Sequence, residues 1–453
     1  MVRRPGILVD LTPLRRYPEF RDLWLGWVVS VLGSQLTVVA VPYEVYRETG
    51  SSLQVGLVSL ASLGAVLVGS FGGGAIADHF DRRRLLLGTQ VLLAATSAGL
   101  ALNASLAHGS LAGIYACSAA AAALSGIGGP TRSALVVHLV DREALVAANA
   151  LWQLLAQIGT VVGPSLAGLL LARVGLAALY WIDTATFAAA VVGVLRIRRG
   201  GGRAERGGLD ASALLGGLRY IRANQVFQAV YLVDLNAMVF GMPRALFPAL
   251  GLGRFHGGPT AVGLLYAAPG AGALLGALLT GRATRVRRQG RAVLVAVAVW
   301  GAAIALFGAV PLLALALPLL AVAGAADVVS ALYRGTILQL EAPDALRGRI
   351  QAVQWAVVTG GPRLGDVEAA GVASAIGPVG SVVSGGVACL VGVAAIAWLL
   401  PGFDRYRAGR ETPEQHGGGL RAGPTTTRGG RTTTEPTTPR LRRATTRTDK
   451  GEG

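Results

Sequence analysis

Residues 72–84 read Gly-Gly-Gly-Ala-Ile-Ala-Asp-His-Phe-Asp-Arg-Arg-Arg, and they join two long apolar runs at residues 55–71 and 85–106. Each run has about the 20 residues that a helix needs to cross the ~30 Å hydrocarbon core of a bilayer. So short a connection forces two antiparallel spanning helices, and its three arginines mark the side of the membrane on which it lies. This stretch therefore sets the topology that the rest of the chain follows.

The composition is typical of a protein that crosses a membrane many times. Of the 453 residues, 53% are hydrophobic and only 14% are charged, whereas soluble globular proteins have about 25% charged residues. The mean hydropathy is +0.55. A membrane-spanning β-barrel would need alternating segments of about ten residues, and these apolar runs are continuous. We therefore expect an all-α membrane protein.

Twelve apolar runs are long enough to span, and a polar break separates the first six from the last six. The expected transmembrane helices are at residues 23–46, 54–77, 85–106, 111–130, 149–172, 176–195, 226–250, 261–280, 292–310, 312–332, 350–375 and 379–400. The predicted domains are a cytoplasmic N-terminus (1–22), an N-terminal six-helix bundle (23–195), a cytoplasmic central loop (196–225), a C-terminal six-helix bundle (226–401) and a cytoplasmic tail (402–453). The tail is polar, so disorder is expected there.

Arginines are distributed unequally between the two sets of connections. One set holds Arg82, Arg132 and the central cluster, whereas the other holds little beyond Arg47, Arg173 and Arg254. Positive residues are retained in the cytoplasm, so we expect both termini there and the protein in the cytoplasmic membrane. The net charge of +17 does not indicate nucleic-acid binding, because the arginines lie between apolar runs and not on one basic face.

The two halves of the chain resemble each other. Arg132-Ser-Ala-Leu is followed by Asp141-Arg-Glu-Ala-Leu, and about 200 residues later Arg334-Gly-Thr-Ile is followed by Pro343-Asp-Ala-Leu. The arginine-rich loop after the eighth expected span echoes the loop after the second at the same offset. Repeats of this kind build secondary transporters that work by alternating access, with the substrate site between the halves.

The connection at residues 72–84 resembles the signature that the major facilitator superfamily carries between its second and third spans. Gly74, Asp78, Arg82 and Arg83 match that signature, whereas Asp81 stands where a second glycine is usual. Asp78 and Arg82 are one helical turn apart, a spacing at which the two side chains can pair. The resemblance implies 12 transmembrane helices in two six-helix pseudo-repeats, with these residues as a conformational latch. The alternative is that the arginines only set topology.

The fifth expected span resembles the antiporter signature of the same superfamily. The matching residues are Gly159, Gly163, Pro164 and Gly168. Residues 150 and 167 are alanines where glycines are usual. Proline removes a backbone hydrogen bond, so a kink is expected at Pro164. The resemblance implies antiport.

Short matches scattered over residues 10–405 resemble the branch of the superfamily that contains the enterobactin exporter and macrolide efflux proteins. They include Tyr17-Pro-Glu-Phe-Arg, Gly263-Leu-Leu-Tyr-Ala-Ala and Leu346-Arg-Gly-Arg-Ile. The resemblance implies proton-coupled export of a small molecule, first of all a siderophore of the enterobactin type. A multidrug or macrolide efflux pump is the alternative. A polytopic membrane enzyme is a remote alternative, because the five histidines show neither a nucleophile pairing nor metal-ligand spacing.

Ionisable residues within the spans are functional candidates, because a charge at the bilayer centre costs on the order of 3 kcal/mol. Arg363 and Asp366 are three residues apart on one face of the eleventh span, and Glu368 faces elsewhere. Either Arg363 and Asp366 form a local pair that holds a glycine-rich helix together, or Asp366 or Glu368 takes up the coupling proton. Asp234, about eight residues into the seventh span, is a second candidate for the proton.

The sequence predicts no cofactor and no metal site. Cys117 and Cys389 lie inside apolar runs without metal-ligand spacing, so they are expected to be small core residues. Asp183 and Asp327 are expected to be structural and to hydrogen-bond with neighbouring helices. The expected partners are a small-molecule substrate, protons and the lipid bilayer, with no nucleic acid, and we expect a monomer.

Overall fold

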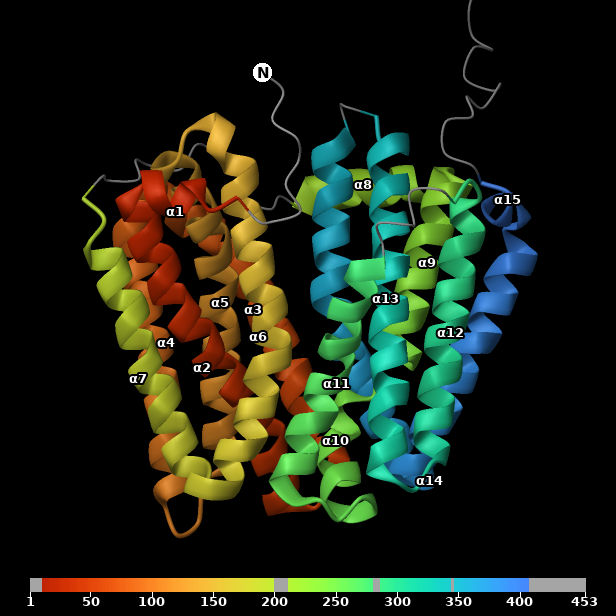
Figure 1. The fold of residues 1–453 in the computed structure, drawn as a ribbon, viewed down its shortest axis with the longest axis horizontal. Helices are drawn as coiled ribbons and strands as arrows, with labels where there is room; N and C mark the ends of the chain where they lie inside the picture. Colours follow the sequence, from red (N-terminus) through yellow and green to blue (C-terminus); the bar gives the residue numbers. More distant parts are fainter. Residues whose placement is uncertain (1–9, 199–210, 280–285, 344–345, 407–453) are drawn as a thin grey trace, which may run out of the picture. The chain divides into compact units, whose positions relative to one another are not determined.

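Long helices follow one another along the chain and form two bundles (Figure 1). The computed structural model describes residues 10–198, 211–279, 286–343 and 346–406, except the side chains of residues 74–79 and 211–214. All of these residues belong to one structural unit, Met1–Ala408. The N-terminal bundle contains α1 (Thr12–Arg16), α2 (Pro18–Thr49), α3 (Ser52–His79), α4 (Arg82–Ser105), α5 (Leu111–Leu139), η1 (Arg142–Ala144), α6 (Leu145–Val174) and α7 (Leu176–Leu195).

The C-terminal bundle follows the same order of long helices, with extra short elements. It contains α8 (Ala211–Ala223), α9 (Gln225–Phe240), η2 (Arg244–Leu246), α10 (Phe247–Ala249), η3 (Leu250–Arg254), α11 (Gly258–Leu279), α12 (Gln289–Ala309), α13 (Leu313–Glu341), α14 (Arg347–Leu399) and α15 (Pro401–Asp404).

The predicted membrane spans are present. Within the described chain, 11 helical segments are long and apolar enough to cross a bilayer. One of them, the 53-residue α14, contains two spans because Gly377 interrupts it with φ 79° and ψ 164°. The segments therefore provide twelve crossings, and the expected fold class of an all-α membrane protein is confirmed.

The same turn occurs at matching places in the two halves. Gly175 joins α6 to α7 with φ 81° and ψ 176°, and Gly377 joins the two parts of α14 with nearly the same angles. Essentially only glycine adopts this conformation. The two glycines are 202 residues apart. Gly50 and Gly258, at the first turn of each half, also share a φ of 62°. These matches confirm the internal repeat.

The seventh span differs from its predicted form, which was one continuous helix over residues 226–250. α9 ends at Phe240, and the chain continues through η2, α10 and the π-helical η3. Pro243 and Pro248 lack the backbone N–H that a continuous helix needs. The carbonyl oxygen of Gly241, freed by this break, accepts a hydrogen bond from Nε1 of Trp300 at 2.8 Å.

Three apolar cores hold the described residues together. One lies within the C-terminal bundle and another within the N-terminal bundle. The third is built mainly from α2, α3, α4, α6 and α7, but it also contains Ala245, Val262 and Ala370 of the C-terminal bundle. The two bundles are therefore joined by buried apolar contact at this third core.

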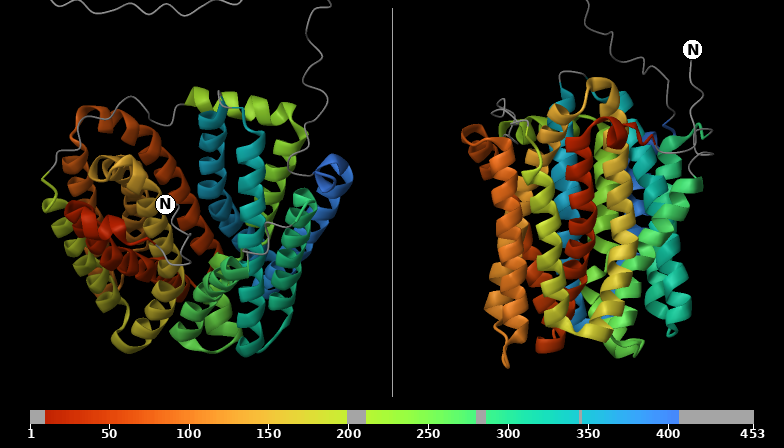
Figure 2. Two further views of the ribbon diagram at one scale, coloured as in Figure 1. Left: turned by 45° about the horizontal axis from the view of Figure 1, so that its top comes forward. Right: turned by 60° about the vertical axis from the view of Figure 1, so that its left-hand side comes forward.

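The two ends of the bundles differ in charge. We call the end with the α3–α4, α5–α6 and α13–α14 connections the arginine-rich end. The far end carries the turns at Gly50, Gly175, Gly258 and Gly377. The arginine-rich end is uppermost in Figure 1, and α8 lies across it in Figure 2.

The predicted domain boundaries stay predictions. The first spanning helix, α2, begins at Pro18 and thus before the boundary expected at residue 23. The central loop at 196–225 includes α8 in its described part. The tail beyond residue 406, and with it the expected disorder, lies outside the described residues.

Candidate functional site

Asp366 lies where the two bundles meet. Its Oδ2 accepts a hydrogen bond from Oγ of Ser59 on α3 at 2.8 Å. Its Oδ1 accepts a second hydrogen bond from the backbone N–H of Ala245 in η2 at 3.1 Å. One carboxyl group on α14 therefore holds together the N-terminal bundle and the broken end of the seventh span.

Glycines bring α14 close to its neighbours around Asp366. A Cβ added at Gly365 would lie 2.2 Å from the carbonyl oxygen of Met238 on α9. A Cβ added at Gly56 of α3 would lie 2.6 Å from Cβ of Ala370. Both distances are shorter than packed atoms allow, so larger side chains at these positions would push α14 away.

Arg363 and Asp366 do not form a pair within the described residues. Nη1 of Arg363 donates to the carbonyl oxygen of Thr359 on its own helix at 2.7 Å. Glu368 is half-buried, and no hydrogen-bond or ion-pair partner for it lies in the described part of the chain. Of the three candidates on this span, Asp366 is the one that contacts the opposite bundle.

Asp234, the second proton candidate, lies in a buried ion pair. Its Oδ1 is 2.8 Å from Nη2 of Arg334 on α13, and the two side chains are only 2% and 6% exposed. Asp327 lies 3.8 Å from the same nitrogen but is 42% exposed. Arg334 also donates from Nη1 to Oγ of Ser330 at 2.6 Å. Sequence patterns placed Arg334 only in a repeat motif and gave no sign of this partner.

Arg132 is the counterpart of Arg334 in the N-terminal half, 202 residues earlier in the chain. Its Cζ lies 4.4 Å from the ring centroid of Trp152 on α6 and 5.3 Å from that of Trp27 on α2. Cation–π attraction at such distances stabilises a guanidinium group. No carboxylate pairs with Arg132 in the described chain, so the two related arginines have different partners.

A cavity of about 190 Å³ adjoins Arg132 inside the N-terminal bundle. Its lining comes from α2, α4, α5 and α7 and includes Trp27, Ser30, Gln90, Ser125, Gly129 and Arg132. It combines an aromatic ring, hydroxyl and amide groups and one cation. The spacing of residues along the chain did not reveal this cavity.

The loop motif between α3 and α4 is described only in part, because the side chains of Gly74 and Asp78 lie outside the described residues. Arg82 is 8% exposed. Its Nη1 lies 3.2 Å from both ring nitrogens of His138 on α5. The contacts described for Arg82 are therefore within the N-terminal bundle.

Arg83 and Asp81 of the same motif stabilise helix ends. Arg83 donates to the carbonyl oxygens of Val194 at 3.2 Å and Leu195 at 2.9 Å, at the C-terminal end of α7. A cation is favourable there because the helix dipole is negative at that end. Asp81 caps α4, since its Oδ1 accepts the backbone N–H of Arg84 at 3.1 Å. Its departure from the family pattern thus has a local role.

The first two residues of the antiporter-like motif pack against α2. A Cβ at Gly163 would lie 2.3 Å from Cβ of Gln35. The carbonyl oxygen of Gly159 accepts a hydrogen bond from Nε2 of Gln35 at 3.2 Å. Small residues are needed here because α6 and α2 pack closely.

The other two residues of that motif meet the opposite bundle. A Cβ at Gly168 would lie 2.8 Å from Cα of Gly263 on α11. A Cβ at Gly263 would lie 2.6 Å from the carbonyl oxygen of Pro164. The backbones of α6 and α11 therefore touch with no side chain between them.

Glu44 is a fully buried carboxyl group that is missing from the predicted site residues. Its Oε2 accepts a hydrogen bond from the hydroxyl of Tyr180 at 2.6 Å, and its Oε1 has no partner in the described chain. The only signal in the sequence was one acidic residue at the end of the first apolar run. Nearby, Asp183 accepts hydrogen bonds from Thr37 at 2.6 Å and Ser97 at 2.8 Å, so the expected hydrogen bonds to neighbouring helices are present.

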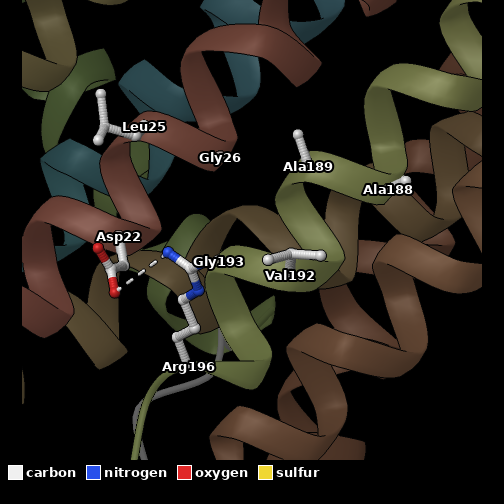
Figure 3. Close-up of a pocket in the computed structure, with 8 residues that line it drawn as sticks. All are labelled: Asp22, Leu25, Gly26, Ala188, Ala189, Val192, Gly193 and Arg196. Carbon is white, nitrogen blue, oxygen red and sulfur yellow. Dashed lines mark ion pairs between the residues drawn. The ribbon is translucent and has the colours of Figure 1, made fainter.

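A second hollow, of about 380 Å³, lies between α2 and α7 near the arginine-rich end (Figure 3). Nη1 of Arg196 and Oδ2 of Asp22 are 3.9 Å apart at its rim. Close packing shapes its floor, since a Cβ at Gly26 would lie 2.5 Å from the carbonyl oxygen of Ala189. Because Arg196 already has a carboxylate partner, this hollow offers no unpaired charge.

The chain has relatives along nearly its whole length. Residues 9–416 match the family model described as transmembrane secretion effector. Over 408 residues the chain is 30% identical to the enterobactin exporter EntS of Shigella boydii serotype 18, and equally to EntS of Escherichia coli O139:H28. Each alignment covers 90% of this chain and 97% of the relative.

Solved structures of transporters have the same fold. A bacterial homologue of the human lysosomal transporter Spinster, inward-facing and unoccupied, matches with a TM-score of 0.68 and 16% identity over 87% of this chain and 99% of its own. A bacterial homologue of the iron transporter ferroportin in an inward-facing state matches with a TM-score of 0.63 and 14% identity over 86% and 99%. With a family match along most of its residues, this chain belongs to the transmembrane secretion effector family of the major facilitator superfamily of transporters.

Proposed function

We propose that the protein exports a siderophore of the enterobactin type across the cytoplasmic membrane, by alternating access and in exchange for protons. Relatives with 30% identity over 97% of their length are enterobactin exporters, which supports this substrate class. The structural observation that carries the proposal is the hydrogen bond between Ser59 and Asp366, which links the two bundles through an ionisable group.

The distribution of arginines orients the molecule in this proposal. The arginine-rich end faces the cytoplasm, because positive residues are retained there, and both termini lie on that side. The bundle contacts at Gly56, Ser59, Gly168 and Asp366 lie in the halves of their helices nearest the far end. The bundles are then closed toward the outside, which is the state in which an exporter takes up its substrate from the cytoplasm.

Proton coupling follows from the position of Asp366 between the bundles. Burying an ionised carboxylate is costly, whereas burying a protonated one is far less so. When the far end is open, Asp366 takes a proton from the outside, and the neutral group is readily enclosed as the bundles close. Release of that proton to the cytoplasm leaves an anion that the hydroxyl of Ser59 and the N–H of Ala245 stabilise.

The loop motif completes the cycle at the other end. In this proposal Gly74, Asp78, Arg82 and Arg83 form a latch that joins the cytoplasmic ends of the bundles when the far end opens. The contacts described for Arg82 and Arg83 are to His138 and to the end of α7, all in the N-terminal bundle. These contacts fit a latch that is open in the present state.

Transport into inside-out membrane vesicles tests the proposal. With the vesicle lumen acidified, the wild-type protein should accumulate enterobactin and not a macrolide. Asp366→Asn should abolish accumulation driven by the pH gradient but keep the exchange of labelled for unlabelled substrate, because asparagine resembles the protonated acid. Glu368→Gln, a half-buried neighbour with no described partner, is the matched control and should transport like the wild type.

Other outcomes would correct the proposal in defined ways. Accumulation of the macrolide alone would identify an efflux pump for drugs. Gradient-driven transport by Asp366→Asn equal to that of the wild type would remove Asp366 as the proton site, and Asp234 would be tested next. If no gradient moves either compound, the proposed substrates are wrong.

A further inference from the structure

We propose that the cavity beside Arg132 binds an aromatic ring that carries an anionic oxygen, as part of the transported molecule. The inference rests on the proposed export function, because it assigns the cavity to part of the transported molecule. It is drawn from a difference between the two halves of the chain.

The partners of the two related arginines occupy equivalent positions. Trp27 and Asp234 are 207 residues apart, as are Pro18 and Gln225, the first residues of α2 and α9. Trp27 therefore stands in the N-terminal half where Asp234 stands in the C-terminal half. Each is the residue of its span that contacts the arginine.

The second tryptophan beside Arg132 also has an equivalent position in the C-terminal half. Trp152 on α6 and Gln354 on α14 are 202 residues apart, the offset that also relates Arg132 to Arg334. At these positions the C-terminal half has a glutamine and the N-terminal half a tryptophan. The repeat thus places an aspartate against Arg334 and two indole rings against Arg132. Within the described residues, only the C-terminal arginine of the two has a carboxylate partner.

Arg132 and its neighbour leave hydrogen-bond donors unused. A guanidinium group has five N–H donors in one plane, which suit the two oxygens of an acidic group. No acceptor for Arg132 lies in the described chain. Nε1 of the neighbouring Trp152 is also buried, with no hydrogen-bond partner among the described residues. Arg132 lines the cavity, so an anionic oxygen that enters it can accept hydrogen bonds from the guanidinium group.

The size and lining of the cavity indicate what carries that oxygen. A cavity of ~150 Å³ is large enough for benzene, and this one measures about 190 Å³. The ring of Trp27 forms one wall, against which another aromatic ring can pack. Ser30 and Gln90, each 3% exposed, supply polar groups for ring hydroxyls. A cationic ligand is disfavoured, because Arg132 would repel it.

Binding to the purified full-length protein tests the inference with three small probes. The first, 2,3-dihydroxybenzoate, has both the ring and the anion, whereas benzamide has only the ring and acetate only the anion. By calorimetry, the first should bind and the other two should bind at least tenfold more weakly. Equal binding of acetate and 2,3-dihydroxybenzoate would overturn the aromatic part of the proposal, and equal binding of benzamide would overturn the anionic part.

Two variants assign the binding to this cavity. Arg132→Gln should weaken binding of 2,3-dihydroxybenzoate about tenfold or more, in the range expected when a charged hydrogen-bond donor is lost. Arg142→Gln, the loss of an exposed arginine near the same helix end, is the matched control and should bind normally. Gly129→Leu should block the cavity without disturbing the fold, because nothing lies within 4 Å of a Cβ added there. Normal binding by both Arg132→Gln and Gly129→Leu would overturn the proposal.

The vesicle assay separates this proposal from the proposed function. If the wild type exports enterobactin and the two cavity variants export it equally well, the cavity proposal fails and the function stands. If the wild type moves no siderophore but still binds 2,3-dihydroxybenzoate in a way that depends on Arg132, the cavity stands and the substrate assignment fails. Reduced binding and reduced export in the same two variants would support both.

Discussion

The hydroxyl of Ser59 donates a hydrogen bond to the carboxylate of Asp366 across 2.8 Å, although the two residues are 307 positions apart in the chain. The contact joins the second span of one bundle to the eleventh span of the other. It lies beside the close approach of Gly56 to Ala370 and the third apolar core. At the junction between the bundles, a hydrogen bond thus lies beside buried apolar residues.

Removing the hydroxyl should loosen this junction. A hydrogen bond to a charged group contributes ~1.5–3 kcal/mol, so Ser59→Ala should shift the balance between closed and open far ends by about tenfold or more. Spin labels at Arg47 and Leu312, both exposed on the far side of different bundles, would report the change as a longer distance. Ser374→Ala removes a hydroxyl that bonds only within α14 and should leave the distance unchanged. An unchanged distance in Ser59→Ala would show that the hydrogen bond does not hold the junction.

A methyl group between α6 and α11 should also open the junction. In Gly263→Ala the new Cβ would lie 2.6 Å from Cα of Gly168 and from the carbonyl oxygen of Pro164. Overpacking of this kind costs ~1–3 kcal/mol. We expect a lower midpoint of thermal unfolding and a more open far end, whereas Gly64→Ala, which meets nothing within 4 Å, should behave like the wild type. Equal stability of the two variants would contradict the backbone contact.

The buried pair between Asp234 and Arg334 should be sensitive to the loss of one partner. Asp234→Asn leaves the charge of Arg334 buried, and breaking such a pair costs ~3–5 kcal/mol. Asp327→Asn should cost less than ~1 kcal/mol, because the Asp327 side chain is 42% exposed. Adding Arg334→Gln to Asp234→Asn should recover part of the lost stability, measured by thermal unfolding in detergent. A double variant as unstable as the sum of the two single variants would show that the residues are not coupled.

The carboxyl group of Glu44 should be neutral in this state, because it has no exposed surface and one of its oxygens has no partner in the described part of the chain. Glu44→Gln replaces a protonated acid with a group of the same shape, so it should change stability little. Tyr180→Phe removes the only described hydrogen bond to Glu44 and should cost ~1–3 kcal/mol. Thermal unfolding of both variants is the measurement. A larger loss in Glu44→Gln than in Tyr180→Phe would indicate that Glu44 is ionised.

The membrane spans and the repeat could be predicted because both depend on local patterns. Runs of about 20 apolar residues define spans whatever their neighbours are. The related motifs at Arg132 and Arg334 gave the offset that the matching turns at Gly175 and Gly377 confirm. The prediction of a continuous seventh span was wrong, although Gly241, Pro243 and Pro248 together are a strong signal against a continuous helix.

The contacts of the site could not be predicted from the same patterns. Spans that are apolar on every side give no sign of which face meets which neighbour. The partners of Asp366 and Arg334 therefore became visible only in the folded chain. Asp81 is different, because an aspartate directly before a run of helical residues is a recognisable N-cap. Its position before the helix explains why an aspartate stands there in place of the glycine of the family pattern.

The contact of Gly168 with Gly263 bears on how fast the bundles can move. Where the side chains of two helices interdigitate, the helices must separate before one can slide along the other, and the side chains must change rotamer. Here two bare backbones face each other, so α6 can roll on α11 with no side chain to reorient. The small size of Gly168 and Gly263 thus lets the two helices move past each other, and the speed of the transport cycle should fall when either glycine is replaced by a larger residue.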